Sequence, residues 1–399
     1  MKILLVNVVY GKGSTGLIVQ DLFKFYRSFG HDAFVAYGRG KKVSDNNVFK
    51  VGYELESNIC HFFSKIGGNI YGGMHFSTNK LISLIKRIEP DIVHLHCING
   101  YFTNIYRLVE YLKNSRQKVV LTNHADFMFT ANCGYSLWCE KWKTEECRRC
   151  PRVSEFNGRL SLNRTHVFYK KMNEAFKNME TLRLTAVSPW LSDRVKLSPI
   201  FKTFPLSTVL NGINISAPNF TNDENPFTSM NPSHKKVVLH VTANFAEKEK
   251  GGEHIFSIAK SCPEYLFFVA GPCNQKSEGN VIFLGRVPNR DLAKYYYFAD
   301  VSLLLSKRET FSMVVAESLT CGTPVVGFLS GGPETIAIKD YSAFVENGNV
   351  PALVEALKSA MSASFNKQQL INLARAKYAL ETSADAYLKI YETFKGEGE

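Results

Sequence analysis

The sequence lacks the features of several common classes of protein. No stretch approaches the ~18–20 consecutive apolar residues that a membrane-spanning helix needs. The apolar run 2–10 is too short for the core of a secretory signal, and no small-residue cleavage site follows it. No short-period repeat occurs, which excludes solenoids and propellers. We therefore expect a cytoplasmic protein without a membrane span.

The sequence also lacks the composition of a disordered chain. Apolar residues make up 45 % and charged residues 21 % of its 399 positions, as in ordinary globular proteins. Because a domain typically holds roughly 100–200 residues, this length predicts two domains.

Acidic residues are scarce in the first half of the chain. Residues 1–200 carry 29 Lys and Arg against 16 Asp and Glu, whereas residues 201–399 carry 19 against 20. The whole net charge of +12 therefore comes from the first half. This asymmetry favours an anionic partner for that half, which could be nucleic acid, a membrane surface or a phosphorylated substrate.

Short apolar segments rich in β-branched residues alternate with segments of helical periodicity. The apolar segments are 2–9, 33–37, 91–96, 119–122 and 184–187, and then 236–241, 265–270, 281–284, 301–305 and 324–327. A stretch rich in proline and asparagine, 216–235, separates the two series and is typical of a linker. The alternation predicts parallel sheets joined by right-handed crossovers.

The fold class expected from this pattern is α/β, with two Rossmann-like, doubly wound parallel-sheet domains facing a cleft. We expect the first domain to cover residues 1–214 and the second to cover residues 215–383. A terminal amphipathic segment, 384–399, is expected to pack back on the first domain.

One segment of the second series, 306–326, combines a strand end, a helix and two glutamates eight residues apart. Glu309 precedes the helix, which is expected to begin near Phe311 and to end at Gly322. The free N–H groups of the first helical turn carry partial positive charge and suit a diphosphate. These groups belong to Phe311, Ser312 and Met313. Glu317, within the helix, can accept hydrogen bonds from vicinal hydroxyls such as those of ribose.

The segment resembles the E-x7-E signature of retaining glycosyltransferases of family 4, which have the two-domain GT-B fold. The positions that match the family block are Glu309, Phe311, Glu317, Gly322, Pro324, Val325 and Val326. Ser318 stands where the family usually has alanine. The resemblance implies that Glu309 is catalytic and holds hydroxyls of the donor sugar, and that Glu317 holds the ribose.

The resemblance extends to a block in which the family clamps the donor diphosphate between an arginine and a lysine. Lys250 and Gly251 match the Lys-Gly pair of that block, so Lys250 is the expected cation. Asn244 stands where the arginine is usual, and this departure weakens the expected clamp at a position that still belongs to the donor site.

Two features of the first half also match the family. The glycine-rich segment 11–16 resembles the loop that approaches the donor diphosphate, through Gly13 and Gly16, although the same spacing suits a simple strand–helix turn. His124 ends an expected strand and matches a catalytic family histidine near the donor sugar and the acceptor, although a lone histidine at such a place is more often structural. Asp126 is a nearby carboxylate.

Four cysteines with the spacing C-x5-C-x7-C-x2-C lie in an insertion, 131–151. They are Cys133, Cys139, Cys147 and Cys150. We interpret them as a structural zinc site, with disulfides and free thiols as the alternatives. A subset of the family carries a similar cluster. Trp, Lys and Arg side chains surround it, which favours a role in acceptor binding or in contact with a membrane interface.

The resemblance implies a metal-independent transferase without a catalytic cofactor, and no D-x-D metal motif stands in a convincing place. Such an enzyme would move a sugar from a UDP- or GDP-sugar, with retention, to a glycan or a polyprenyl-diphosphate-linked acceptor. The pathway would be the synthesis of a capsular, extracellular or lipopolysaccharide. The expected place is the cytoplasm, with peripheral contact to the inner face of the plasma membrane.

Other functions fit part of the sequence. A sugar-nucleotide epimerase or a phosphorylase shares this architecture, but an epimerase needs no basic acceptor-side insertion, and we find no evidence for a phosphorylase's pyridoxal phosphate lysine. A nucleic-acid-binding zinc protein would explain the basic first half and the cysteines, but not the two-glutamate block. We therefore expect no nucleic acid partner.

Overall fold

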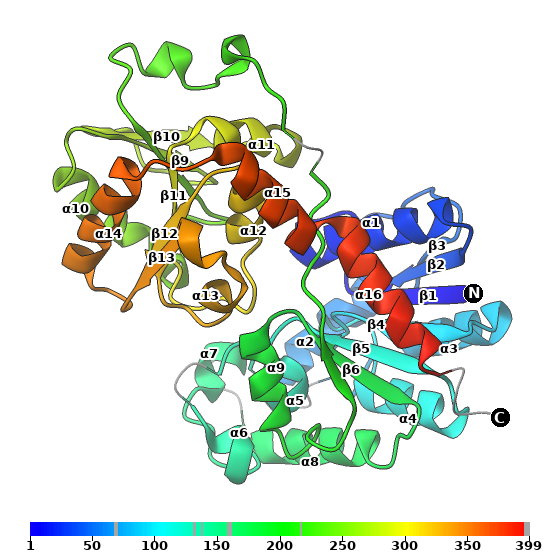
Figure 1. The fold of residues 1–399 in the computed structure, drawn as a ribbon. Helices are drawn as coiled ribbons and strands as arrows, with labels where there is room; N and C mark the ends of the chain where they lie inside the picture. Colours follow the sequence, from blue (N-terminus) through cyan, green and yellow to red (C-terminus); the bar gives the residue numbers. More distant parts are fainter. Residues whose placement is uncertain (68–70, 131–132, 137–138, 158–161, 216–217, 395–399) are drawn as a thin grey trace. The chain divides into compact units, whose positions relative to one another are not determined.

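The computed structural model describes residues 1–67, 71–130, 133–136, 139–157, 162–215 and 218–394. The chain forms two compact units (Figure 1). The first unit combines Met1–Leu210 with Ser383–Glu399, and the second is Asn211–Thr382. Each unit is built on one open parallel sheet, so the predicted fold class is confirmed.

The first sheet has seven parallel strands in the order β3-β2-β1-β4-β5-β6-β7. The strands are β1 (Lys2–Asn7), β2 (Asp32–Tyr37), β3 (Val48–Lys50), β4 (Ile92–Leu95), β5 (Val119–Asn123), β6 (Leu182–Ala186) and β7 (Leu206–Thr208). The order reverses between β1 and β4. In open α/β sheets, ligands bind beyond the carboxyl ends of the strands at such a reversal.

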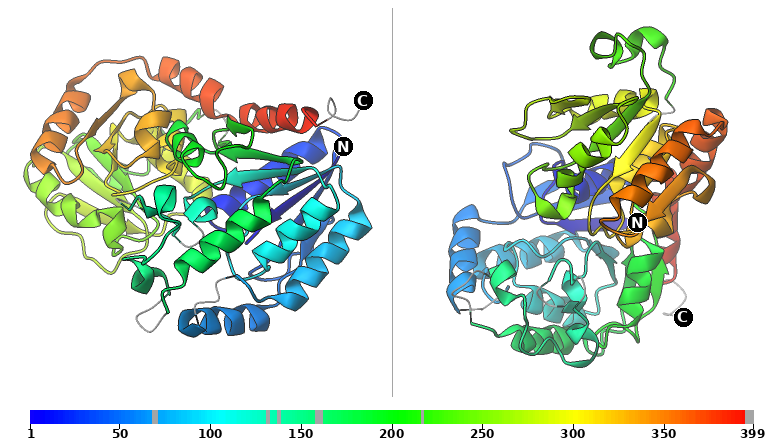
Figure 2. Two further views of the ribbon diagram at one scale, coloured as in Figure 1. Left: turned by 90° about the horizontal axis from the view of Figure 1, so that it is seen from below. Right: turned by 90° about the vertical axis from the view of Figure 1, so that its left-hand side faces the viewer.

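Helices cover both faces of the first sheet (Figure 2). They are α1 (Gly13–Ser28), α2 (Glu54–Gly67), α3 (His75–Ile88), α4 (Ile105–Asn114), α5 (Phe127–Thr130), α6 (Lys141–Thr144), α7 (Val153–Asn157), α8 (Thr165–Phe176) and α9 (Pro189–Lys196). The central strand β1 is fully buried from Ile3 to Val6. A strand covered on both faces needs apolar side chains at every position, which explains its uninterrupted apolar run.

The last helix, α16 (Leu380–Glu392), ends in the first unit. Its Tyr387 and Tyr391 side chains are buried there. The Tyr391 hydroxyl lies 3.4 Å from the Tyr26 hydroxyl of α1, and Thr122 Oγ1 of β5 donates to the Tyr387 hydroxyl at 3.2 Å. Polar contacts as well as apolar packing therefore hold this helix on the first unit.

The second sheet has six parallel strands in the order β10-β9-β8-β11-β12-β13. The strands are β8 (Val237–Val241), β9 (Leu266–Ala270), β10 (Val281–Gly285), β11 (Val301–Leu304), β12 (Val325–Phe328) and β13 (Ser342–Val345). The order reverses between β8 and β11, which places the expected ligand position of this unit at the ends of those two strands.

The second sheet also has a hydrophobic core on each face. The helices of this unit are α10 (Ile255–Lys260), α11 (Asn289–Phe298), α12 (Met313–Thr320), α13 (Gly332–Ile336), α14 (Val350–Ser362) and α15 (Lys367–Tyr378). One core joins α10 and α14 to the sheet through Ile258 and Leu357. The other joins α11 to the opposite face through Tyr296.

Two local expectations need correction. The helix expected near Phe311 begins at Met313, because Ser312 has a positive φ of 78° and occupies the N-cap position. The expected end is right, since α12 stops at Thr320 and Gly322 follows with φ 80°. The linker interpretation fails for residues 218–235, because Phe227 is buried in the second core and its ring lies 4.5 Å from that of Phe268.

Candidate functional site

An ion pair stands at the strand reversal of the second unit. Lys250 lies in the loop after β8, and Glu309 lies in the loop after β11. Lys250 Nζ is 2.8 Å from Glu309 Oε1. The two side chains stay 23 % and 17 % exposed. The structure therefore brings together two residues that the sequence resemblance assigns to one site, and it leaves both partly open to solvent.

The glycine after Lys250 fixes the course of this loop. Gly251 has φ 67°, a conformation that favours glycine, and a Cβ atom there would lie 2.0 Å from the carbonyl oxygen of Leu305. The amide of Lys307 also donates to the carbonyl of Glu249 at 2.9 Å. The loop after β8 thus lies directly against the loop after β11, and only glycine permits that approach.

A third loop, after β12, holds Glu309 from the other side. The amide of Glu309 donates to the carbonyl of Ser330 at 3.0 Å, and the amide of Gly332 donates to the carbonyl of Glu309 at 2.9 Å. The Glu334 carboxylate accepts from the amides of Ser330 and Gly331, at 3.2 and 2.8 Å. The backbone of Glu309 is therefore fixed, while its side chain faces Lys250.

The start of α12 follows Glu309 by a few residues. The first N–H groups of a helix lack partners within the helix, and they carry partial positive charge. The Ser312 hydroxyl accepts from the amide of Val315 at 3.5 Å, which is a long contact. Phe311 is only 3 % exposed, so its ring belongs to the core, whereas Met313 is partly exposed. This turn suits an anion through its backbone rather than through its side chains.

Glu317 lies one helical turn further along α12, where it contacts Tyr296 of α11. Burial raises the pKa of Glu317 to about 7, and the neighbouring Tyr296 hydroxyl lowers that pKa in part. The geometry of this contact falls short of a full hydrogen bond. A carboxyl that is close to half-protonated at neutral pH can both donate to and accept from sugar hydroxyls.

Asn244 is exposed in the loop after β8, and its Oδ1 accepts from the amide of Ala246 at 3.2 Å. The side chain has no charge to offer a diphosphate. This position therefore lacks the positive charge that the usual arginine would supply. The cation of this loop that contacts Glu309 is Lys250.

In the first unit, His124 directly follows β5 and is partly exposed. Its Nε2 atom lies 3.1 Å from Nδ1 of His96, which follows β4. Burial lowers the pKa of His124 to about 4 and places that of His96 well below its ordinary value. Both imidazoles are therefore neutral at pH 7.

The glycine-rich segment forms a tight turn from β1 into α1. The amide of Gly11 donates to the carbonyl of Gly16 at 2.9 Å, and Gly13 has φ 65° at the first position of the helix. A Cβ atom on Gly16 would lie 3.0 Å from the side chain of Val9. The turn alone explains these glycines, so their contact with a diphosphate stays a prediction.

Asp126 serves as a structural anchor. It is fully buried, and it accepts two hydrogen bonds from Arg194 of α9, at 3.1 and 2.9 Å. The amide and hydroxyl of Ser136 also donate to it, each at 2.8 Å. With its oxygens engaged in this way, Asp126 ties the start of the cysteine-rich insertion to α9.

The thiols of the four cysteines of the insertion interact with one another. A hydrogen bond from the Cys133 thiol lowers the pKa of Cys150 to about 6, and the same contact raises the pKa of Cys133. Cys147 is close enough to Cys150 and Cys139 for their charges to raise its pKa further, beyond the effect of burial. Within the described residues, no group of three or more ligating side chains is arranged to hold a metal ion. The zinc site therefore stays a prediction.

A basic hollow of about 640 Å³ adjoins this insertion. Its lining residues are Lys141, Glu145, Arg148, Arg149, Asn163, His166 and Lys170. The single carboxylate among them pairs with Lys141 at 3.1 Å. The hollow therefore presents an excess of positive charge, which is suited to an anionic ligand.

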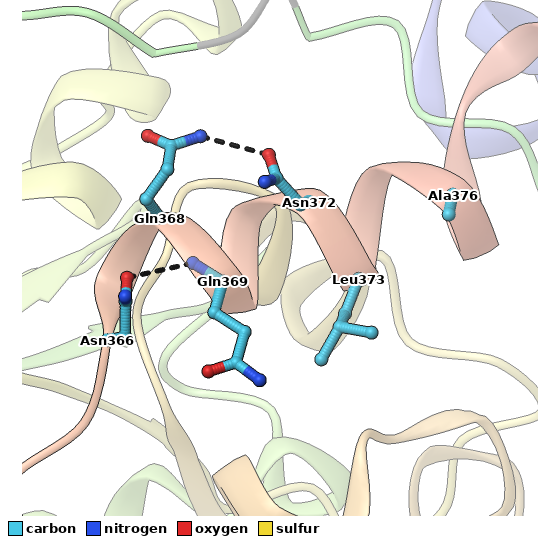
Figure 3. Close-up of a pocket in the computed structure, with 6 residues that line it drawn as sticks. All are labelled: Asn366, Gln368, Gln369, Asn372, Leu373 and Ala376. Carbon is cyan, nitrogen blue, oxygen red and sulfur yellow. Dashed lines mark hydrogen bonds between the residues drawn. The ribbon is translucent and has the colours of Figure 1, made fainter.

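Another hollow lies along α15 and differs in character. Amide and apolar side chains line it (Figure 3), and they are Asn366, Gln368, Gln369, Asn372, Leu373 and Ala376. Gln368 donates to Asn372 at 3.0 Å. Without an ionisable group in its lining, this hollow offers no acid, base or charge for catalysis.

Comparison with known proteins bears on the family and the fold. Residues 222–377 match the model of the family described as Glycosyl transferases group 1. The sucrose-phosphate synthase of Thermosynechococcus elongatus is similar in structure, with a TM-score of 0.71 over 99 % of each chain at 15 % identity. The fold is GT-B.

Two further proteins are similar to this chain. It is 22 % identical to a putative colanic acid biosynthesis glycosyl transferase, WcaC, of Escherichia coli K12, over 98 % of this chain and all of that protein. The Anabaena protein HepE, solved in complex with UDP, aligns with a TM-score of 0.64 and 14 % identity over 98 % of this chain and all of that chain. The family match and the fold support a GT-B glycosyltransferase. No helix in the described ranges is long and apolar enough to cross a bilayer.

Sequence reasoning missed two residues that shape these sites, His96 and Tyr296. His94 and His96 are two residues apart at a strand end, so they point to the same face of the sheet, and this spacing was a usable signal for a histidine cluster beside His124. Glu334 could be selected from the sequence, because segment 331–334 is similar to the G-G-x-x-E loop of the family. Tyr296 gave no local signal, because its contact with Glu317 joins two helices.

Proposed function

We propose that the protein is a retaining glycosyltransferase that takes its sugar from a nucleotide-diphosphate donor. The observation that carries the proposal is the Lys250–Glu309 ion pair at the strand reversal, beside the start of α12. A bound ligand can replace each partner of such a pair. A donor diphosphate would bind Lys250 in place of Glu309, and the freed carboxylate would accept hydrogen bonds from hydroxyls of the donor sugar.

The remaining positive charge for the leaving diphosphate would come from the first turn of α12. Glu317 would bind the ribose hydroxyls, and His124 would face the sugar and the acceptor. Because Lys250 and backbone N–H groups would balance the negative charge of the leaving diphosphate, the proposed reaction needs no metal ion or other catalytic cofactor. Retention follows from the resemblance of the E-x7-E block to the retaining family. UDP is the favoured nucleotide, since the HepE neighbour was solved with it.

We further propose an anionic, lipid-linked acceptor, of the polyprenyl-diphosphate kind, in the synthesis of a surface polysaccharide. The basic hollow supports an anionic acceptor, and the similarity to a putative colanic acid transferase supports the pathway. The loop that carries Arg148 and Arg149 is held in place, because Asn163 exchanges two hydrogen bonds with Cys150 and Thr165 Oγ1 donates to the carbonyl of Cys147 at 2.7 Å. A cytoplasmic location with peripheral membrane contact accompanies this proposal.

The test of the donor is a panel of UDP-, GDP- and ADP-sugars in EDTA, read by thermal shift and by release of the nucleotide. We expect one nucleotide-sugar to stabilise the protein and to be turned over without metal, with both effects reduced in Lys250→Met. No response to any donor would overturn the proposal. Conversion of the donor sugar without nucleotide release would point to an epimerase instead.

The test of the acceptor uses the double variant Arg148→Glu/Arg149→Glu with a polyprenyl-diphosphate sugar. We expect the KM for this acceptor to rise at least tenfold while donor affinity is unchanged. The matched control is Arg116→Glu/Lys202→Glu, which alters charge equally at exposed positions of the same unit. If the two double variants raised the KM for the acceptor equally, the effect would come from the general surface charge of the unit and not from the hollow.

A further inference from the structure

Three histidines form a line at the carboxyl ends of β4 and β5. The rings of His94 and His96 lie 4.0 Å apart, centre to centre, and those of His96 and His124 lie 5.3 Å apart and are stacked. His94 is fully buried, His96 is 1 % exposed, and His124 is partly exposed. The line therefore runs from the interior of the first unit to its surface.

The inner end of the line is fixed by hydrogen bonds. His94 Nδ1 lies 2.6 Å from the Tyr391 hydroxyl of α16, and its Nε2 lies 2.7 Å from Thr122 Oγ1. Thr122 in turn contacts Thr185 of β6 at 2.7 Å. With both ring nitrogens engaged, the His94 ring cannot turn without breaking a buried hydrogen bond. The His96 ring packs against this fixed ring at an interplanar angle of 33°.

At the outer end, His96 and His124 share one hydrogen bond of 3.1 Å between Nδ1 and Nε2. Burial lowers the pKa of both rings, so each carries a single proton at pH 7. One nitrogen of the contact must donate and the other must accept. The tautomers of His96 and His124 are therefore coupled.

Packing alone does not account for a histidine at position 96. Its Nε2 atom is buried and has no hydrogen-bond partner within the described residues. An unpaired buried nitrogen is costly, and a leucine or phenylalanine of similar size would avoid that cost. What the imidazole adds over an apolar side chain is the bond to His124.

We propose that His96 is a positioning residue, which holds the His124 ring in one orientation and one tautomer and is itself braced by His94 and α16. The consequence for chemistry rests on the proposed function, in which His124 faces the donor sugar and the acceptor. A histidine can direct an N–H or a lone pair at a given substrate oxygen only if its tautomer is set. The C-terminal helix thus contributes to the site through two histidines without touching substrate.

The experiment compares His96→Leu with His96→Asn in the full chain. Asparagine places a polar atom near the position of Nδ1 and can keep the bond to His124, whereas leucine cannot. Labelling the ten histidines with ¹⁵N allows the His124 ring to be observed by long-range ¹⁵N–¹H correlation, with His124→Gln for assignment. We expect one neutral tautomer in the wild type, a mixture in His96→Leu, and a single tautomer again in His96→Asn.

Turnover provides the second readout. We expect kcat to fall about 10–100-fold in His96→Leu with the donor KM nearly unchanged, and to recover in large part in His96→Asn. Thermal melting of each variant separates this effect from loss of folded protein. An unchanged His124 tautomer in folded His96→Leu would overturn the proposal, and so would equal kcat values for the two variants.

Failure of the proposed function gives a different result. If the wild type turned over no nucleotide-sugar, or if His124→Gln left kcat unchanged, the transferase role of His124 would fall. The tautomer measurement needs no substrate, so it would still decide whether His96 sets the state of His124.

Discussion

Burial raises the pKa of Glu317 to about 7, well above the ordinary 4.5 at which this carboxyl titrates in the unfolded chain. The folded state therefore binds this proton more tightly than the unfolded state does, and ionisation of Glu317 lowers the free energy of unfolding. This loss of stability is absent below about pH 4.5 and complete above about pH 7. We expect Glu317→Gln to stabilise the protein by about 1–3 kcal/mol at pH 8 and to have little effect at pH 4.5.

Urea unfolding of wild type and Glu317→Gln at the two pH values measures this difference. Glu355→Gln, at an exposed position of α14, is the control and should show no such pH dependence. A gain in stability that is equal at both pH values would mean that the carboxyl titrates normally in the folded protein.

The Lys250–Glu309 pair predicts opposite effects on UDP and on a UDP-sugar. Lys250→Met should weaken UDP binding about 10–100-fold, because a hydrogen bond to a charged group contributes roughly 1.5–3 kcal/mol. Glu309→Gln should leave UDP binding unchanged or tighter, since it frees Lys250, but it should weaken binding of the whole UDP-sugar. Titration calorimetry of each variant with each ligand gives four dissociation constants, which are compared with those of the wild type.

A matched control for this pair joins Lys294 of α11 to Glu224. Lys294 and Glu224 also stand 2.8 Å apart, and both are 38 % exposed. Lys294→Met should alter neither ligand's affinity. If Glu309→Gln weakened UDP as much as the UDP-sugar, Glu309 would be supporting Lys250 rather than binding sugar hydroxyls.

At the scale of elements, the Asp126–Arg194 pair joins the cysteine-rich insertion to α9. Removal of one partner of a buried pair leaves an uncompensated charge, so we expect Asp126→Asn to destabilise the first unit by about 3–5 kcal/mol. The double variant Asp126→Leu/Arg194→Met should cost less than the two single changes together. Calorimetric melting measures the effect.

The neighbouring pair of Asp193 and Lys196 is the control for this prediction. The separation is 3.1 Å, but the two side chains are 73 % and 65 % exposed, and Asp193→Asn should therefore change stability by less than about 1 kcal/mol. Equal losses for Asp126→Asn and Asp193→Asn would mean that the buried pair does not anchor the insertion.

Elements with strong local signals were predictable from the sequence. The end of α12 followed from Gly322, since a glycine with positive φ stops a helix. Its start was expected two residues too early, because serine is not a residue type that prefers the positive φ that Ser312 adopts. The short strand β7 was missed, since it has one apolar residue, Leu206, followed by two exposed polar residues, and this gives no apolar run.

The two sites differ in how much of them a sequence can predict. Lys250 and Glu309 could be assigned together, because each follows a strand and matches a family block. The network behind His124 could not, because it joins β4, β5, β6 and a helix nearly 300 positions away, as in the His94–Tyr391 bond. Long-range hydrogen bonds depend on tertiary packing, and no local spacing predicts them.

At the scale of the whole molecule, the two units divide the residues of the proposed reaction. The second unit holds Lys250, Glu309 and Glu317, whereas the first holds His124 and the basic hollow. Most of the excess positive charge of the chain lies in its first half. This division predicts that the diphosphate and the sugar of a donor will slow amide hydrogen exchange in different segments of the chain.

Hydrogen exchange measured by mass spectrometry tests this division in the intact protein. UDP has a diphosphate but no sugar, so it should slow exchange mainly in residues 242–252 and 305–317 of the second unit. A UDP-sugar should add protection around residues 96–100 and 123–130 of the first unit, where the His96–His124 bond lies. If the UDP-sugar protected no more of the chain than UDP does, His124 would not face the transferred sugar, and the reaction would have to be assigned to residues of the second unit alone.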